Sequence, residues 1–101
     1  MNKKPFYEKY YLTIGHYKNN NRLYLGLENE EDYFGDITIN LPEADIPEGY
    51  VAINNDIDFI FQDLIEKDLF DSDYRWLKYN YGLYRIARVN LSTMLEYGIE
   101  L

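Results

Sequence analysis

The sequence predicts a single α+β domain that spans residues 1–101. We expect a mainly antiparallel sheet, made of a three-strand meander plus C-terminal strands, with one main amphipathic helix and a short C-terminal helix. Two patterns predict this class: apolar residues alternate at period two before residue 42, and they recur at helical spacing after residue 56. Because 47% of the residues are hydrophobic, the chain can build one core.

The first part of the chain predicts three antiparallel strands joined by two tight turns. On the second strand Leu23, Leu25 and Leu27 share one face, and the third strand alternates in the same way. Both turns are rich in Asn or acidic residues, which favour turn geometry. The predicted strands are residues 7–17, 22–28 and 33–41, and the predicted turns are residues 18–21 and 29–32.

The main helix follows a proline-bounded loop and a short extended segment, residues 50–53. Asn54, Asn55 and Asp56 supply an N-cap. Apolar residues then recur at the spacing that buries one helix face. We therefore predict an amphipathic helix over residues 56–69, with Ile57, Ile60, Phe61, Leu64 and Ile65 on its apolar face and Asp58, Gln62, Asp63, Glu66 and Lys67 on its polar face.

The C-terminal part is aromatic and basic. An Asp-rich segment, residues 68–73, ends the main helix, and residues 74–89 predict one or two strands around Gly82. Asn90 is a candidate cap for a short last helix over residues 91–97, which Gly98 would stop.

Charge is distributed unevenly along the chain, whose net charge is −8. Residues 28–73 hold fifteen of the eighteen acids and one base, Lys67, so this middle segment carries −14. The flanking residues 1–27 and 74–101 carry +4 and +2. An acidic middle favours binding to a positively charged partner. The alternative interpretation is that the acids serve solubility alone.

The composition excludes several classes of enzyme. The lack of Cys removes a disulfide scaffold, a thiol nucleophile and Cys-ligated zinc. His16 is the only histidine and the six glycines are isolated, so neither a hydrolytic triad nor a phosphate-binding loop is predicted. We therefore predict no enzyme, no catalytic residue, no metal and no cofactor. A carboxylate-bound metal is the remaining alternative, but Asp56 and Asp58 are better explained as first-turn acids facing the helix dipole.

The sequence also favours a cytoplasmic location. The N-terminus, residues 1–5, is basic, but no apolar segment follows it, so we expect no signal peptide. No stretch reaches the roughly 20 apolar residues of a membrane span.

Tyrosines and acids together predict a binding surface. The chain has twelve Tyr residues, and Tyr is enriched in strands and in protein interfaces. Carboxylates on a turn and a helix face can stand in for phosphates on a basic groove. The Tyr- and Arg-rich residues 74–89 form either a strand with outward charges or a contact for RNA. The predicted partner-binding residues are Glu28, Glu30, Glu31, Asp32, Tyr33, Asp36, Asp58, Asp63 and Glu66, with Tyr24 as a further aromatic anchor.

Residues 17–27, 34–42 and 47–55 resemble a family of small uncharacterised domains carried on plasmids, conjugative elements and phages of gut Firmicutes. In that family a strand ends in an Asn-Leu-Pro-like turn, as residues 40–42 do here, before an extended segment and a helix. The resemblance covers roughly residues 6–90. This chain departs from the family at residues 71–76, where the family has a Gly-rich stretch.

Mobile elements of this kind carry anti-CRISPR proteins, and the chain is similar to small type II anti-CRISPR proteins in size, acidity and Tyr content. The resemblance implies a stoichiometric inhibitor in a host bacterial cell. It would bind a type II CRISPR effector nuclease, or its guide RNA complex, on a basic nucleic-acid surface. The resemblance transfers no functional motif at the level of single residues. Two alternatives stay open: an accessory protein of the element with another protein partner, and an enzyme that cuts guide RNA. A homodimer through an edge strand or a Tyr-rich face is also compatible with the sequence.

Overall fold

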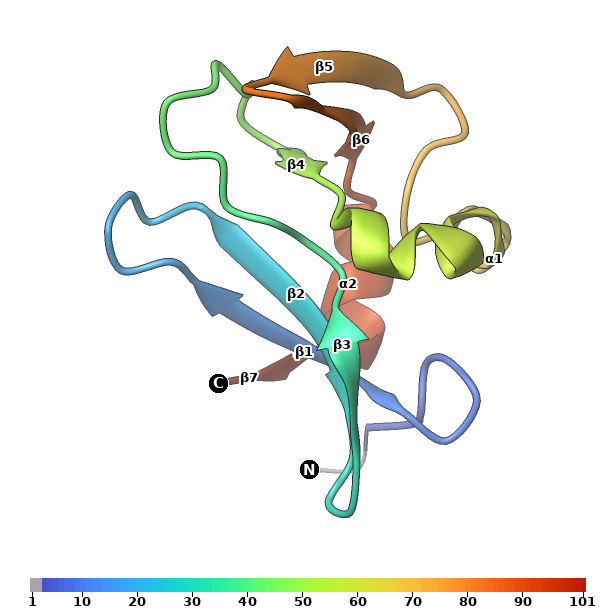
Figure 1. Cartoon of the computed structure of the whole chain (residues 1–101). Coiled ribbons are helices and arrows are strands. Elements are labelled where there is room, and N and C mark those ends of the chain that lie inside the picture. Colours follow the sequence, from blue (N-terminus) through green and yellow to red (C-terminus); the bar gives the residue numbers. More distant parts are fainter. Residues whose placement is uncertain (1–2) are drawn as a thin grey trace.

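The structure, a computed structural model, describes residues 3–101, so Met1 and Asn2 of the basic N-terminus lie outside the described residues. It confirms the α+β fold, with seven strands in two sheets and two α-helices among the described residues (Figure 1). The elements are β1 (Tyr11–His16), β2 (Leu23–Glu28), β3 (Tyr33–Asp36), β4 (Tyr50–Ala52), the 3-10 helix η1 (Asn55–Ile60), α1 (Phe61–Glu66), β5 (Arg75–Tyr79), β6 (Gly82–Arg88), α2 (Leu91–Tyr97) and β7 (Ile99–Glu100).

The first sheet has the strand order β3-β2-β1-β7. β1 and β2 form the predicted antiparallel pair, with Leu12 opposite Leu27 and Ile14 opposite Leu25. All four side chains are buried, as the alternation predicts. β7 adds in parallel to the other edge of β1. It is not predicted from the sequence, because two residues carry no periodicity.

The third predicted strand, residues 33–41, divides between the two sheets. β3 ends at Asp36, and the chain then turns toward the second sheet, where Thr38 forms a bridge with Ile53. The alternating pattern continues beyond β3 because the chain stays extended, although its neighbouring strand changes.

The second sheet has the strand order β4-β6-β5, with both pairings antiparallel. The β5–β6 hairpin confirms the strands predicted around Gly82. In its turn Asn80 has a φ of 55°, a left-handed conformation that Asn adopts more readily than most residues. The structure therefore has two sheets where one was expected. Alternation shows which residues share a face, but it does not show which strands are neighbours.

The predicted helix over residues 56–69 is shorter than expected and begins as a 3-10 helix. The Asn54 side chain caps η1 by accepting from the N–H of Asp56 at 3.1 Å. α1 follows directly and ends at Glu66, and Asp68, with a φ of 65°, turns the chain away. Most of the predicted apolar face is buried, namely Ile57, Ile60, Phe61 and Leu64.

α2 confirms the predicted C-terminal helix. The side-chain oxygen of Asn90 accepts from the N–H of Ser92 at 3.1 Å and from that of Thr93 at 3.4 Å. The N–H of Gly98 donates to the carbonyl of Met94 at 2.8 Å and closes the last turn. A Cβ at Gly98 would overlap the side chain of Ile14, so α2 packs closely against β1 only because this residue is Gly.

The main core joins buried side chains from both sheets with those of η1 and α1. A smaller apolar cluster lies on the other face of the second sheet, around Ala52 and Ile86. In Figure 1 α1 lies beside the space between the two sheets. Among the helices of residues 3–101, none has the length and hydropathy needed to cross a bilayer.

Candidate functional site

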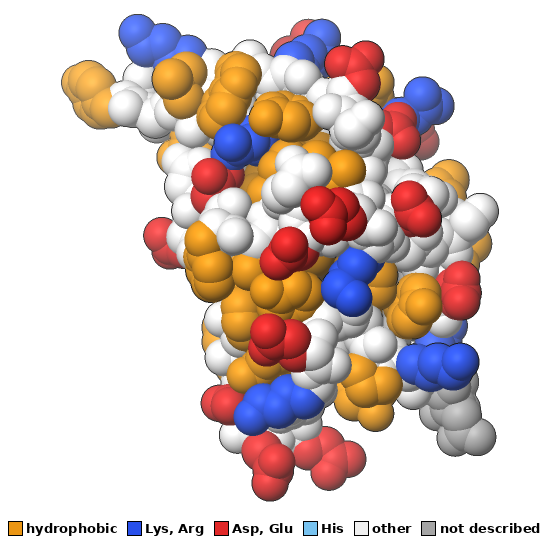
Figure 2. All heavy atoms as spheres, turned by 90° about the vertical axis from the view of Figure 1, so that its right-hand side faces the viewer, with side chains coloured by type: hydrophobic (Ala, Val, Ile, Leu, Met, Phe, Trp, Pro, Cys, Tyr) orange, Lys and Arg blue, Asp and Glu red, His pale blue; other side chains and the backbone are white. Residues whose placement is uncertain are grey.

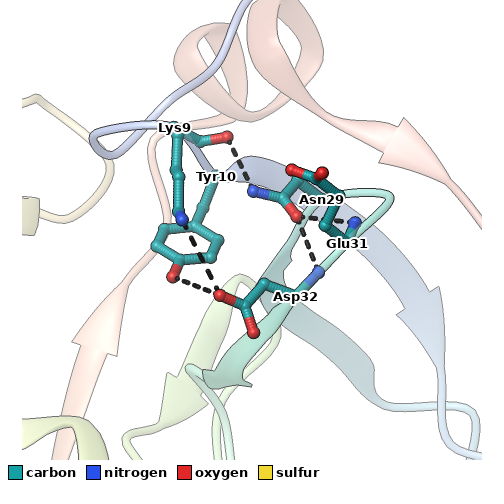
Figure 3. A network of polar contacts seen from close by, with 5 residues as sticks. All are labelled: Lys9, Tyr10, Asn29, Glu31 and Asp32. Carbon is teal, nitrogen blue, oxygen red and sulfur yellow. Dashed lines mark hydrogen bonds and ion pairs between the residues drawn. The ribbon is translucent and has the colours of Figure 1, made fainter.

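The turn between β2 and β3 carries the densest group of predicted contact residues, and it is held by a polar network (Figure 3). The side-chain oxygen of Asn29 accepts from the N–H of Glu31 at 2.9 Å and from that of Asp32 at 2.7 Å. The Asp32 carboxylate lies 3.7 Å from the Lys9 ammonium and accepts from the Tyr10 hydroxyl at 3.4 Å. Asp32 therefore fixes the turn to the N-terminal segment.

Glu30 and Glu31 occupy the outer end of this ordered turn. Both are exposed, and within residues 3–101 neither forms an ion pair. The Asn29 side chain accepts hydrogen bonds from the backbone of this turn, so the backbone that carries the two carboxylates is ordered. A partner would lose little backbone entropy by binding them.

Asp36 anchors two tyrosines on the outer face of the first sheet. Its carboxylate accepts from the Tyr24 hydroxyl at 2.7 Å and also from the Tyr33 hydroxyl. Burial raises the pKa of Tyr24 well above its ordinary value, and the hydrogen bond to Asp36 raises it further. Partial burial and the same carboxylate raise the pKa of Tyr33 to about 12. Tyr24 is therefore a half-buried support, whereas Tyr33 is 58% exposed.

Glu28 belongs to this outer face as well. It is opposite Tyr33 in the sheet register, and it lies two residues from Gly26 on the side of β2 away from the core. Glu28, Tyr33 and Asp36 therefore lie on the outer face of the first sheet, whereas η1 and α1 lie on its core side. The predicted contact residues divide between two sides of the first sheet.

An aromatic cluster connects part of the turn to α1. The rings of Tyr7 and Tyr10 pack against Phe34, with centroid distances of 5.7 and 5.0 Å. The Tyr7 hydroxyl donates to Asp63 at 3.2 Å, while the Tyr10 hydroxyl donates to Asp32. Asp32 and Asp63, which are far apart in sequence, thus flank one aromatic cluster.

The sequence predicts Asp58 as a partner-binding residue, but in the structure its carboxylate is paired within the protein. Its carboxylate forms an ion pair and hydrogen bond with Arg85 of β6. The Arg85 guanidinium lies over the rings of Trp76, Phe61 and Tyr74, at 4.3, 5.1 and 5.2 Å from their centroids. Asp58 therefore neutralises an internal base instead of standing free.

Few of the acids are neutralised inside the molecule. Among residues 3–101 there are two ion pairs, Lys9–Asp32 and Arg85–Asp58. Figure 2 shows acidic side chains spread over the side that carries α1, with basic and hydrophobic side chains between them. Glu66 is exposed at the end of α1. In the same described range, no group of three or more His, Asp or Glu side chains is arranged to hold a metal ion.

Three exposed apolar residues near Asp58 were not predicted as contacts. Phe59, Trp76 and Leu83 are 76, 53 and 57% exposed. A signal for Phe59 was present, because it lies off the apolar stripe of the predicted helix. Trp76 and Leu83 gave no such signal, because either face of a predicted strand can be the buried one.

A comparison of this chain with known protein families, with curated proteins and with solved structures finds no match. The resemblance described above stays a prediction.

Proposed function

We propose that this protein is a stoichiometric inhibitor that binds a positively charged, nucleic-acid-binding surface of another macromolecule. One observation carries the proposal: the protein has a net charge of −8, and most of its acids have no basic partner within residues 3–101. Such a field speeds association with a basic partner. The ordered Glu30–Glu31 turn and the exposed Asp63 and Glu66 supply carboxylates for it.

The proposed target is a type II CRISPR effector nuclease or its guide RNA complex, in the cytoplasm of a host bacterial cell. Effectors of this class hold nucleic acid in strongly basic channels. The physical argument supports a basic channel, and the resemblance to small type II anti-CRISPR proteins supplies the identity of the target. The proposal assigns no catalytic group and no cofactor to the chain.

The experiment is a cleavage assay with purified effector, guide RNA and target DNA, in which this protein is added before or after the guide. We expect inhibition that saturates near one protein per effector and weakens as salt rises, because salt screens exposed charges. Full cleavage at low salt with excess protein would refute the proposal. Shortened guide RNA after incubation would support the enzyme alternative. A separate pull-down from the host that returns a partner other than a CRISPR effector would support the accessory role.

A charge-reversal pair tests which surface acts. Glu30→Lys with Glu31→Lys should weaken inhibition more than Glu96→Lys with Glu100→Lys, although both changes alter the net charge equally. All four residues are exposed, so neither pair should disturb the core. Equal effects would show that net charge acts without a defined surface.

A further inference from the structure

β5 is the longest edge strand of the two sheets within residues 3–101. It ends the order β4-β6-β5, and Figure 1 shows no element beyond it at the top of the view. The opposite edge of this sheet is covered, because the N–H of Ile39 donates to the carbonyl of Ala52 in β4 at 3.0 Å. An uncovered edge strand is a template for pairing with another strand.

The hydrogen-bond pattern shows which backbone groups of β5 point outward. The carbonyl of Arg85 in β6 accepts from the N–H of Ile53 at 2.9 Å, so Arg85 bonds on the β4 side. Trp76 is opposite Arg85, and Lys78 is opposite Leu83, two residues along β6. Since backbone bonding alternates along an antiparallel ladder, the N–H and carbonyl groups of Trp76 and Lys78 point away from β6. Among the described residues, no hydrogen bond outside the strand ladders reaches either of them.

β5 can pair with β5 of a second copy along its whole length in one antiparallel register. This register centres on Leu77 and places Trp76 opposite Lys78 of the second copy, so the outward-pointing N–H and carbonyl groups of each pair bond to one another. It also places Arg75 opposite Tyr79 of the second copy. The two three-stranded sheets then form one continuous sheet.

The side chains along this register are complementary. β5 holds two bases and no acid, and each base is opposite an aromatic residue of the second copy, where a cation–π contact is favourable. Arg85 already lies over the Trp76 ring, 4.3 Å from its centroid, but Asp58 neutralises Arg85 and Trp76 stays 53% exposed. Leu77, which is half-buried against the smaller apolar cluster, meets its own copy at the centre.

Other registers are less favourable. A shift by two residues in one direction places Lys78 opposite Lys78 of the second copy, and like charges directly opposite are destabilising. The same shift in the other direction leaves Tyr79 without a partner in β5.

The charges outside β5 limit the strength of the pairing. On this sheet Arg75, Lys78 and Arg88 are exposed and form no ion pair among the described residues, while the exposed Asp71 and Asp73 precede β5. Each copy carries −8 in total, so two copies repel at long range and salt should strengthen their association. Because each copy contributes one strand, we expect a weak dimer that depends on concentration.

We propose that this protein forms a symmetric dimer through antiparallel pairing of β5 with β5 of a second copy. The dimer goes beyond the proposed function, because β5 lies at the opposite end of the molecule from the β2–β3 turn (Figure 1). Each dimer therefore presents two copies of that acidic turn. A target with two basic sites within reach would bind both copies together more tightly than one.

The test is sedimentation equilibrium of the purified protein over a range of concentrations, at low and at high salt. We expect the mass to rise from one copy to two, with tighter association at the higher salt. Lys78→Pro removes the outward N–H, which Pro permits at a sheet edge, whereas Lys78→Ala keeps it. Lys78→Pro should stay monomeric, and Lys78→Ala should still dimerise, although more weakly than the unmodified protein.

A second pair of variants tests the register. Trp76→Glu and Trp76→Lys both remove the indole ring, but only Trp76→Glu places a carboxylate opposite Lys78 of the second copy. Trp76→Glu should therefore dimerise about tenfold or more tightly than Trp76→Lys. Circular dichroism checks that each variant is folded, and the Trp76 pair decides the question if Lys78→Pro does not fold.

Three results would overturn the proposal. The first is a monomer at every concentration and salt, and the second is equal association of Lys78→Pro and Lys78→Ala when both are folded. The third is equal association of the two Trp76 variants. The measurement uses this protein alone, so its outcome does not depend on the proposed target.

Discussion

Arg85→Ala perturbs the contact that joins η1 to the second sheet. The Arg85 side chain is 19% exposed and its partner Asp58 is 40% exposed. The substitution removes the ion pair and leaves the carboxylate beside the aromatic rings of Phe61 and Trp76. The negative faces of such rings do not favour a carboxylate.

The expected loss of stability lies between two limits. Removing one partner of a fully buried pair costs about 3–5 kcal/mol, whereas an exposed pair contributes about 0–1 kcal/mol. Because solvent reaches Asp58, we assign about 1–2 kcal/mol to the pair. Three aromatic rings contact the same Arg85 guanidinium, so we count their cation–π interactions together as about 1 kcal/mol. The total of about 2–3 kcal/mol corresponds to a fall in Tm of about 10–20 °C for a domain of this size.

Urea unfolding followed by circular dichroism measures this loss. Arg85→Lys keeps the charge without the planar guanidinium, so we expect about half the effect. Arg88→Ala is the matched control, because Arg88 lies exposed on the same strand and forms no ion pair within residues 3–101. A double-mutant cycle with Asp58→Ala isolates the energy of the pair. A loss below about 1 kcal/mol for Arg85→Ala, the range of an exposed pair, would refute the reasoning.

Three further predictions concern other parts of the fold. The pKa of Tyr24 is raised in the folded state by burial and then by Asp36, so its contribution to stability is present below pH of about 10 and is lost as pH rises further. Tyr24→Phe should flatten this alkaline loss, measured by tyrosinate absorbance and circular dichroism; an unchanged alkaline profile would contradict it. Gly98→Ala should cost about 1–3 kcal/mol or more by overpacking, since its Cβ would lie 2.5 Å from the Met94 carbonyl oxygen. Gly15→Ala, which meets only ordinary contacts of 3.5 Å and more, is its control, and equal thermal shifts would count against the overlap. Asn29→Ala should cost about 1–2 kcal/mol in urea unfolding because two N–H groups lose their acceptor; Asn29→Asp keeps the acceptor and should recover most of this loss.

Local patterns predict most of the fold, and contacts between distant residues account for what they miss. The alternation of Leu25 and Leu27 in β2 and the helical spacing of Ile57, Ile60 and Leu64 identify faces that are indeed buried. The separation into two sheets is not encoded in that periodicity, because it depends on which strands become neighbours. The helix is also shorter than its apolar spacing predicts, since α1 ends at Glu66 and Asp68 turns the chain with a φ of 65°.

The candidate site was predictable as a charge distribution but not as a set of contacts. The exposure of Glu30, Glu31 and Glu66 agrees with their polar surroundings in the sequence. The pairing of Asp58 with Arg85 joins residues from different elements, and no spacing rule indicates it. The sequence therefore shows how many acidic residues the middle segment contains. The fold determines which of their carboxylates form no ion pair among the described residues.

The parallel pairing of β7 with β1 affects the order in which the molecule can assemble. Thr13 is opposite Ile99, and the N–H of Leu101 donates to the carbonyl of Ile14 at 2.8 Å. One edge of β1 is thus completed by residues that the ribosome adds almost ninety positions later. Pairings with such long sequence separation slow folding. During synthesis this edge of the β1–β2 hairpin therefore stays open until residues 99–101 have been added.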